Sequence, residues 1–281
     1  MSLFDLREPT DLVAPLLVAS FDGWVDAGAA ATTAAARLAE GAETIATFDA
    51  DRLYDYRARR PTLEIVDGRL DRLTWPELTL RRARFGERDL LILSGPEPDY
   101  RWHELEQAAV ELARRLEVAA WISLGAIPAA VPHTRPVTVL GTESRPGLLR
   151  GGVTAGPEGV LRVPAAAISV LDFAVSRAGV AAVGYYAQIP HYVTGIYPPA
   201  SVELLLLVGQ HLEHEVAMGE LRDEARRVLA RLDTATAGDA NTRAYVERLE
   251  VMVDEARRPA GDDLITEIER FLHDQGGGDR S

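Results

Sequence analysis

Residues 16–30 read LLVASFDGWVDAGAA, and this stretch decides the fold class. An apolar run ending at Phe21 is typical of a strand that is buried on both faces. Asp22 and Gly23 follow as a turn, and the Ala-rich residues from Asp26 onward favour a helix. Strand, glycine turn and helix in this order form the repeating unit of α/β folds, whose ligands bind beyond the carboxyl ends of the strands.

The same alternation continues through most of the chain. Short runs rich in Val, Ile and Leu predict strands over 13–20, 43–48, 88–94, 119–124, 137–141 and 181–187. Ala-rich stretches between them predict helices over 26–40, 100–116 and 166–178. Residues 62–85 break this rhythm and predict an antiparallel excursion on the edge of the sheet. We therefore expect an α/β fold with a mixed, mainly parallel sheet flanked by helices.

From about Pro199 onward the strands stop and helical spacing takes over. We expect helices over 202–218, 220–232, 242–256 and 262–273. This pattern divides the chain into an α/β core domain, 1–205, and an all-helical C-terminal portion, 206–281. Apolar residues repeat in the tail at steps of three and four: Val228, Leu232, Val246, Leu249, Val253, Ile265, Ile268 and Leu272. These stripes must be buried against the core, one another or a neighbouring subunit.

Composition excludes several classes of protein. The chain has 281 residues, of which 47% are hydrophobic and 26% charged, as in soluble globular proteins. Its net charge of −13 disfavours nucleic acid and anionic membranes as partners. The chain contains no Cys, which excludes thiol nucleophiles and Cys-based zinc sites, and no Lys, which excludes Schiff-base and phosphate-loop lysines. We find no signal peptide and no apolar run of the ~20 residues that cross a bilayer, and expect a cytoplasmic protein.

The turn after the first buried strand is one candidate binding site. The spacing of Gly23 and Gly28 superficially matches a phosphate loop, but the lysine and hydroxyl residue that would contact phosphate are absent. In one interpretation Asp26 caps the helix, Gly28 permits close packing and Trp24 fills the turn. In the other, Asp22, Trp24 and Asp26 line a pocket.

Two proline-stiffened loops place further polar residues after strands. His133 and Arg135 follow the strand over 119–124, and His191 and Tyr192 follow the strand over 181–187. If both loops face one mouth of the sheet, these side chains join the Asp22 group in a common cleft suited to an anion or to acid–base chemistry. Asp22 and Asp26 would oppose a triphosphate there, which favours a small polar metabolite. The alternative is that each imidazole simply bonds to backbone at a strand end.

Two other groups of residues give weaker evidence for a metal or catalytic site. His211 and His214 lie three residues apart beside Glu215, but a solvated helix face explains them better than a metal site, since no third ligand follows at a recognisable offset. Ser123 lacks the first glycine of the hydrolase nucleophile elbow. We therefore assign no catalytic residue, no metal and no cofactor.

A short basic run stands out in this acidic chain. Tyr54, Tyr56, Arg57, Arg59 and Arg60 lie together before Pro61. They form either a solvated loop or a contact with another subunit or a substrate, because Tyr and Arg are enriched at interface hot spots.

Taken in order, these clusters resemble one family. The ordered motifs are Phe21-Asp-Gly-Trp24-x-Asp26-Ala-Gly28, Tyr54-Asp-Tyr-Arg57-x-Arg-Arg-Pro61, Gly95-Pro-Glu97-Pro98 with Trp102, Ile127-Pro-Ala-Ala-Val-Pro132-His133-Thr134-Arg135-Pro136, Pro190-His191-Tyr192 and Tyr197-Pro198. Over nearly the whole chain they resemble the bacterial branch of the proteasome assembly chaperone family, the PAC-two family. The resemblance implies a nucleoside-phosphorylase-like α/β core, a helical C-terminal portion and a homo-oligomer, in particular a trimer. It implies no established enzymatic activity.

The sequence is compatible with two functions of different classes. The first is an assembly-chaperone-like protein that acts without catalysis, through protein–protein contacts as a homo-oligomer, on clients related to proteasome assembly. The chain ends in Gly-Asp-Arg-Ser, without the hydrophobic-Tyr-any ending of archaeal relatives, so we do not expect its terminus to dock into a proteasome ring. The alternative is a small-molecule binding protein, or a hydrolase- or phosphorylase-like enzyme, that uses a cleft with Asp22, Asp26, His133, Arg135 and His191.

Overall fold

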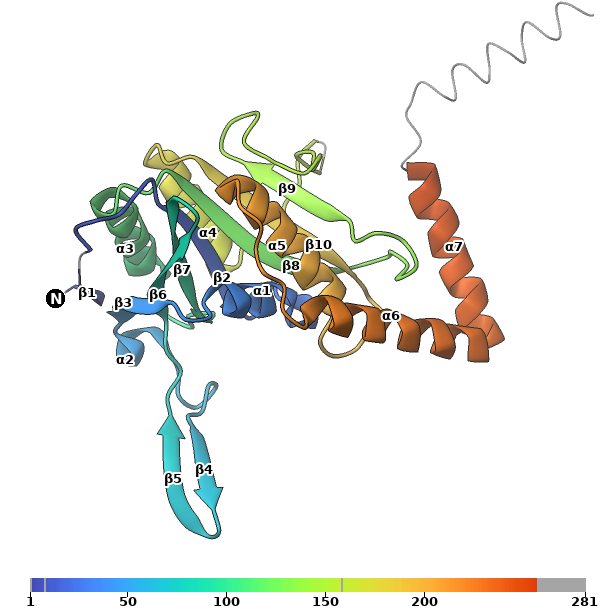
Figure 1. Cartoon of the computed structure of the whole chain (residues 1–281), viewed down its shortest axis with the longest axis horizontal. Helices are drawn as coiled ribbons and strands as arrows, with labels where there is room; N and C mark the ends of the chain where they lie inside the picture. The colour runs from blue at the N-terminus through green and yellow to red at the C-terminus, as the bar shows by residue number, and fades with distance from the viewer. Residues whose placement is uncertain (1, 8, 158, 257–281) are drawn as a thin grey trace, which may run out of the picture.

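The centre of the computed structural model, which describes residues 2–7, 9–157 and 159–256, is an eight-stranded sheet (Figure 1). Its strands lie in the order β1 (Phe4–Leu6), β3 (Glu43–Phe48), β6 (Thr79–Phe85), β7 (Arg88–Pro96), β2 (Leu16–Asp22), β8 (Ala120–Ala129), β10 (Ala182–Pro190) and β9 (Val139–Glu143). The four strands β7, β2, β8 and β10 are parallel, and the outer strands join them antiparallel. The expected α/β fold with a mixed sheet is confirmed.

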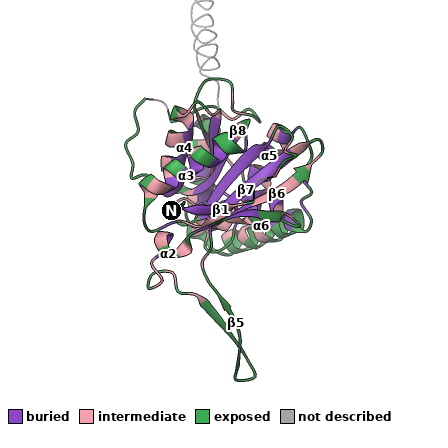
Figure 2. Ribbon diagram, turned by 90° about the vertical axis from the view of Figure 1, so that its left-hand side faces the viewer, coloured by how far each residue is buried: buried purple, intermediate pink, exposed green. Residues whose placement is uncertain are grey.

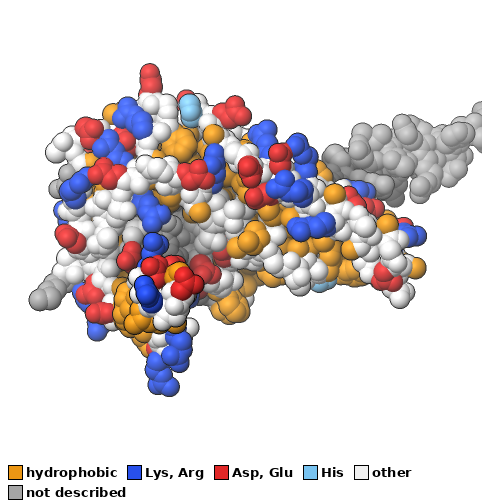
Figure 3. All heavy atoms as spheres, turned by 60° about the horizontal axis from the view of Figure 1, so that its bottom comes forward, with side chains coloured by type: hydrophobic (Ala, Val, Ile, Leu, Met, Phe, Trp, Pro, Cys, Tyr) orange, Lys and Arg blue, Asp and Glu red, His pale blue; other side chains and the backbone are white. Residues whose placement is uncertain are grey.

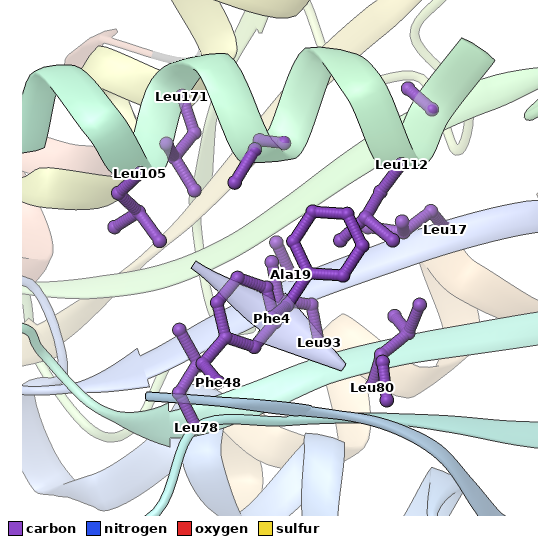
Figure 4. Packing of buried hydrophobic residues seen from close by; sticks show 14 of the residues in the cluster. Phe4, Leu17, Ala19, Phe48, Leu78, Leu80, Leu93, Leu105, Leu112 and Leu171 are labelled. Atoms are coloured by element: carbon purple, nitrogen blue, oxygen red, sulfur yellow. The ribbon is translucent and has the colours of Figure 1, made fainter. Parts of the chain in front are cut away.

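Helices cover both faces of this sheet. The 3₁₀ turn η1 (Ala27–Ala29), α1 (Ala30–Leu38) and α5 (Pro198–Leu212) lie on one face, and α3 (Trp102–Arg115) and α4 (Ala167–Arg177) lie on the other. Along β2, Leu16 and Val18 pack toward α1 and α5, while Leu17 and Ala19 pack toward α3 and α4. Because successive strand residues point to opposite faces, a strand covered on both sides is apolar throughout. Figure 4 shows the core between the sheet and α3, with Leu105 and Leu112 of α3 above Leu17 and Leu93 of the sheet.

Two strands continue beyond the residues at which the sequence pattern ends them. We expected β8 to end at Leu124 and β10 at Ala187, but they pair in parallel as far as Pro190 opposite Ala129. The pairing of β8 with β2 stops at Ser123. Beyond that point only an isolated bridge, Asp26 with Ala126, pairs with this side of β8 among the described residues. A proline is tolerated where its missing N–H faces no strand partner.

The segment over 62–85 divides into two parts. Its last strand, β6, lies inside the sheet between β3 and β7, whereas β4 (Thr62–Val66) and β5 (Arg69–Thr74) form a separate hairpin that projects from the core (Figures 1 and 2). Asp67 and Gly68 at the tip both have positive φ, 50° and 74°, as a two-residue hairpin turn requires. All residues of β4 and β5 are exposed.

The helical tail packs on its own chain. The expected division near residue 205 falls inside α5, which shares a core with α1. A short helix, α2 (Ala50–Leu53), follows β3. The structure describes two helices of the tail: α6 (Leu221–Gly238), which contacts α5, and α7 (Ala240–Ala256), which rises steeply from the far end of α6 (Figure 1). Val246 and Leu249 of α7 are both 3% exposed. The helix expected over 262–273 lies outside the described residues. In the part of the chain that the structure describes, none of the helices is both long and apolar enough to cross a membrane.

Candidate functional site

The loops that follow β8 and β10 meet at the carboxyl edge of the sheet and bring His133 and Tyr192 together. The Tyr192 hydroxyl accepts the backbone N–H of His133 at 2.8 Å and lies 2.7 Å from its Nδ1. Since that hydroxyl has one proton to donate, the arrangement places the His133 proton on Nε2, which lies 3.3 Å from Asp233 Oδ1 of α6 but is not aligned for a hydrogen bond. Burial raises the pKa of Tyr192, so the phenol stays neutral.

Arg135 in the same loop is bound by α7. Its Nε and Nη2 donate to the two carboxylate oxygens of Asp254 at 2.9 and 2.8 Å, and its Nη1 lies 3.2 Å from Glu250. Thr134 also donates to Glu250. The Arg135 guanidinium, which we expected to face a ligand anion, therefore faces two carboxylates of its own chain, and these raise its pKa further.

His191 makes a third connection to α7. Its Nδ1 lies 3.0 Å from the carbonyl oxygen of Ala129, and its Nε2 lies 2.8 Å from the Tyr245 hydroxyl. The carbonyl can only accept, so Nδ1 carries the proton and Nε2 accepts the hydroxyl of Tyr245. The ring thus bonds to backbone at a strand end and to the tail helix at the same time.

Apolar packing completes the closure by α7. Val253 lies against Val131, Pro132, Pro136 and Tyr197 around a cavity of only about 10 Å³. This volume is at the lower limit for one water molecule. In this arrangement α7 therefore occupies the place that a ligand of His133, Arg135 and His191 would take.

The residues of the first turn lie apart from this cluster. The Asp26 carboxylate accepts the backbone N–H of Ala31 at 2.8 Å and that of Thr32 at 3.3 Å, together with the Thr32 hydroxyl. It therefore caps the first turn of α1, and burial raises its pKa. Gly28 has φ 62°, and a Cβ there would lie 2.9 Å from the Tyr197 side chain. Trp24 does not fill the turn, because it is 70% exposed.

Asp22 lines a pocket of about 300 Å³ with Arg81, Glu77, Thr32 and Ser94. The pocket lies where β2 and β7 end, beside α1. Among the described residues, the hydrogen bonds and ion pairs do not link it to His133, Arg135 or His191. The structure thus divides the expected cleft into two groups, one under α7 and one beside α1.

Sequence reasoning assigned no role to Glu97, which connects three segments. Its Oε1 accepts the N–H of Ala167, the first residue of α4, at 2.7 Å, and its Oε2 accepts the N–H of Trp24 at 3.1 Å. A Cβ on Gly23 would approach the Glu97 side chain to 2.5 Å. The glycine in the turn after β2 is therefore required by a carboxylate in the turn after β7, a relationship that spacing along the chain does not show.

The Tyr and Arg run lies at the base of the projecting hairpin. Tyr54 differs from the expectation of an exposed contact: it is 3% exposed, donates to the Pro96 carbonyl at 2.9 Å and has its pKa raised by burial. Tyr56 donates to Asp51 at 2.6 Å, which raises its pKa to about 12, and its ring packs edge-on against Trp75 at 4.8 Å. Arg59 lies 3.4 Å from Asp99, and Arg57 and Arg60 are exposed.

The paired histidines of α5 and the loop after it have different surroundings. His211 Nε2 lies 2.8 Å from the Tyr185 hydroxyl, and burial lowers its pKa to about 4. His214 packs edge-on against Phe85 instead. Over residues 2–7, 9–157 and 159–256, His, Asp and Glu form no group of three that could hold a metal ion.

Comparison with known proteins places the chain in a family. The sequence profile of the PAC2 family matches residues 20–236. A search of curated proteins found no significant match. Among solved structures, a protein of unknown function from Corynebacterium glutamicum is 29% identical, with a TM-score of 0.83 over 90% of this chain and 98% of its own.

Two further structures carry the family description. A PAC2 family protein from Streptomyces avermitilis is 35% identical with a TM-score of 0.75, over 83% of this chain and 99% of its own. A proteasome-assembly chaperone homologue from Mycobacterium tuberculosis is 33% identical with a TM-score of 0.75, over 82% of this chain and 99% of its own. The match of the profile over well over half of the chain agrees with both. The chain belongs to the PAC2 family.

Proposed function

We propose that this protein is an assembly-chaperone-like protein that acts without catalysis, through protein–protein contacts, as a homo-oligomer in the cytoplasm. The observation that carries the proposal is the apolar face of the hairpin β4–β5. On this face Leu63 pairs with Leu73 and Ile65 with Leu70, and their exposed fractions are 48%, 48%, 58% and 77%. Figure 3 shows hydrophobic atoms gathered on the projecting hairpin.

An isolated two-stranded hairpin is at best marginally stable in water. Apolar patches of this kind, standing away from the core, mark surfaces that bind another protein. The base of the hairpin adds Arg57, Arg60 and Trp75, which is 45% exposed. Arg and Trp beside an aliphatic centre are typical of interface hot spots. The surface formed by the hairpin and its base, residues 57–75, is therefore our candidate for the contact between subunits.

The engagement of Arg135 and His191 by α7 also favours protein contacts over catalysis. Catalytic groups need access to a reacting molecule, and these side chains are instead bonded to the tail helix. Support for the class of client comes from the Mycobacterium tuberculosis relative, which is described as a proteasome-assembly chaperone homologue. We infer clients related to proteasome assembly for this chain as well.

Light scattering coupled to size-exclusion chromatography tests the assembly at micromolar concentration. The monomer mass is 30.6 kDa, so the trimer that we propose has a mass of about 92 kDa. The triple variant Leu63→Thr, Ile65→Thr, Leu70→Thr keeps β propensity and removes three of the four aliphatic side chains of this face, and we expect it to be monomeric. The double variant Val160→Thr, Leu161→Thr changes exposed apolar residues elsewhere and should assemble like wild type. A wild-type mass near 31 kDa would contradict the proposed assembly.

The client is tested separately. Purified proteasome α and β subunits from Mycobacterium tuberculosis, the source of the relative described above, are mixed with the protein and ring assembly is followed on native gels. We expect faster ring assembly with wild type and a smaller effect with the triple hairpin variant. An unchanged rate, with wild type an oligomer, would reject this client class while leaving the assembly proposal intact.

A further inference from the structure

A pocket of about 310 Å³ lies between α4 and the edge strands β9 and β10, outside both groups described above. Its volume is at the lower end of the range for small-molecule sites. Five of its lining residues carry hydroxyl groups: Thr142, Ser144, Ser169, Ser176 and Tyr186. The rest of the lining consists of Phe173, Ala182, Val183 and Gly184 and the carboxylates of Asp172 and Glu143. The lining contains neither Arg nor His. A hydroxyl-rich pocket with carboxylates attracts cations and repels anions.

Asp172 is the unusual group in this pocket. Its Oδ1 accepts the indole N–H of Trp121 at 2.9 Å and the hydroxyl of Ser123, and its Oδ2 accepts the hydroxyl of Tyr186 at 3.3 Å. These donors are neutral, and no charged side chain of the described residues is among the causes of its pKa shift. A buried carboxylate without a cation is costly, and such groups cluster at functional sites.

The hydrogen bonds of Asp172 leave room for one further donor. Each carboxylate oxygen can accept about two hydrogen bonds. Oδ1 has two donors, whereas Oδ2 has the single long bond from Tyr186. Glu143 at the other side of the pocket is held by the backbone through one oxygen, because its Oε2 accepts the N–H groups of Leu148 and Leu149 at 2.8 and 3.2 Å. The open acceptor position of the Asp172 carboxylate is therefore Oδ2.

The geometry points to a small primary amine as the ligand, with its ammonium group bonded to Asp172 Oδ2 and its body among the hydroxyl groups of the pocket. A guanidinium fits less well, because its planar fork requires two adjacent acceptors. A divalent metal ion needs more oxygen ligands than this pair of carboxylates supplies, and the described residues contain no group of three or more His, Asp or Glu that could hold one. A neutral polyol would satisfy the hydroxyl groups and leave the carboxylate without a counter-charge.

The surroundings of Asp172 define how binding should respond to pH. The titratable and charged groups near it are Tyr186 on β10 and Glu143 on β9, and on α4 itself Arg177, which lies 5.6 Å from the centre of the Phe173 ring. From α3, Glu106, Glu111, Arg114 and Arg115 line a separate surface with Ala174 of α4. Burial raises the pKa of Asp172 to about 7, while burial holds the Tyr186 phenol neutral. We therefore expect Asp172 to change charge between pH 6 and pH 8.

Isothermal titration calorimetry with ethanolamine, and with ethylene glycol as its neutral counterpart, tests the inference on the full chain. The amine stays protonated between pH 6 and pH 8, while about a tenth of Asp172 is ionised at pH 6 and about nine tenths at pH 8. Because the apparent affinity scales with the competent fraction, we expect ethanolamine to bind about tenfold more weakly at pH 6. Ethylene glycol should not bind. Ethanolamine has few atoms, so we expect its Kd to be in the millimolar range.

Two variants and one control locate the site. Asp172→Asn should lose ethanolamine binding at pH 8. Ser176→Leu fills the pocket without touching the Asp172 bonds and should also lose it, which keeps the test decisive if Asp172→Asn folds poorly. Asp223→Asn, on the exposed side of α6, should bind like wild type. Equal binding of ethylene glycol, retention of affinity in Asp172→Asn or Ser176→Leu, or no binding to wild type at pH 8 would overturn the inference.

Discussion

Arg135 and Asp254 form a two-pronged ion pair, with N–O distances of 2.9 and 2.8 Å, that joins the loop after β8 to the last described turns of α7. The two residues are 119 positions apart in the chain. Planar Arg–carboxylate pairs of this kind hold orientation as well as charge. The side chains are 31% and 47% exposed, so solvent weakens the pair and its contribution to global stability should be about 1 kcal/mol or less.

We predict that Arg135→Ala loosens α7 without unfolding the core. Hydrogen exchange of the amides in 240–256 should become faster, while exchange in β2 and β8 stays unchanged, since the core does not depend on this pair. Arg226→Ala, which removes an exposed arginine of α6, is the matched control and should leave α7 protected. Unchanged exchange of α7 in Arg135→Ala would show that its other contacts, such as buried Val246 and Leu249 and the Tyr245–His191 bond, hold the helix without the ion pair.

A second prediction concerns His211. Burial lowers its pKa to about 4, from an unfolded value near 6.5, so the unfolded chain takes up the proton first as pH falls. The neutral ring therefore contributes stability that is fully present above about pH 6.5 and is lost as pH falls toward 4. The loss at pH 5 should be about 2 kcal/mol at most, because the ring is partly exposed to solvent.

Urea unfolding of wild type and His211→Gln at pH 7.5, 6 and 5 measures this effect. Glutamine takes up no proton, so the advantage of wild type over the variant should shrink as pH falls. The exposed Gln107→Ala on α3, which changes no titratable group, serves as the control, and its difference from wild type should stay constant. A constant difference for His211→Gln would mean that the folded ring takes up its proton as readily as the unfolded chain does.

The sequence predicted the central elements because strands that are buried on both faces consist almost entirely of apolar residues. The strand expected over 43–48 has the observed bounds, and the buried runs of β2, β7, β8 and β10 were found with errors at their ends. The end of β8 was missed because a proline stops a strand only where its N–H would pair, and pairing with β2 had already stopped at Ser123. That condition depends on a neighbouring strand rather than on local sequence.

The candidate site was less accessible to sequence reasoning. Proline-stiffened loops indicated that His133, Arg135 and His191 follow strands, but nothing local indicated that Tyr245, Glu250 and Asp254 would bond to them. The spacing of Val246, Leu249 and Val253 predicted a buried stripe without naming what covers it. Likewise, Leu63 and Ile65 alternate like residues of any half-buried strand, and only the three-dimensional structure shows that their face is exposed.

A third prediction concerns Glu97. Glu97→Ala removes the acceptors for the N–H groups of Ala167 and Trp24 and leaves the start of α4 without its cap. Loss of such a cap costs about 1–2 kcal/mol. Glu97→Gln keeps one carbonyl oxygen and should cost about half as much. The nearby exposed Glu77→Ala is the control for loss of a surface charge, and should change the urea midpoint little. If Glu97→Ala unfolds at the same midpoint as Glu77→Ala, the carboxylate does not hold α4.

The last prediction concerns the stability contributed by Asp172. Burial raises its pKa from 3.8 to about 7, so the folded protein holds this proton more tightly than the unfolded chain does. The contribution to stability is therefore fully present below about pH 3.8 and is lost as pH rises through 7. Between pH 5 and pH 9 wild type should lose about 2–3 kcal/mol from this group. Asp172→Asn keeps an oxygen for Trp121 and Ser123 and carries no charge, so it should gain on wild type by that amount over this range. His211 is present in both proteins and cancels from their difference. Urea unfolding at pH 5, 7 and 9 measures the gap, with the exposed Asp223→Asn as control. A gap that does not change with pH would mean that the carboxylate is already balanced by a charge in the folded protein.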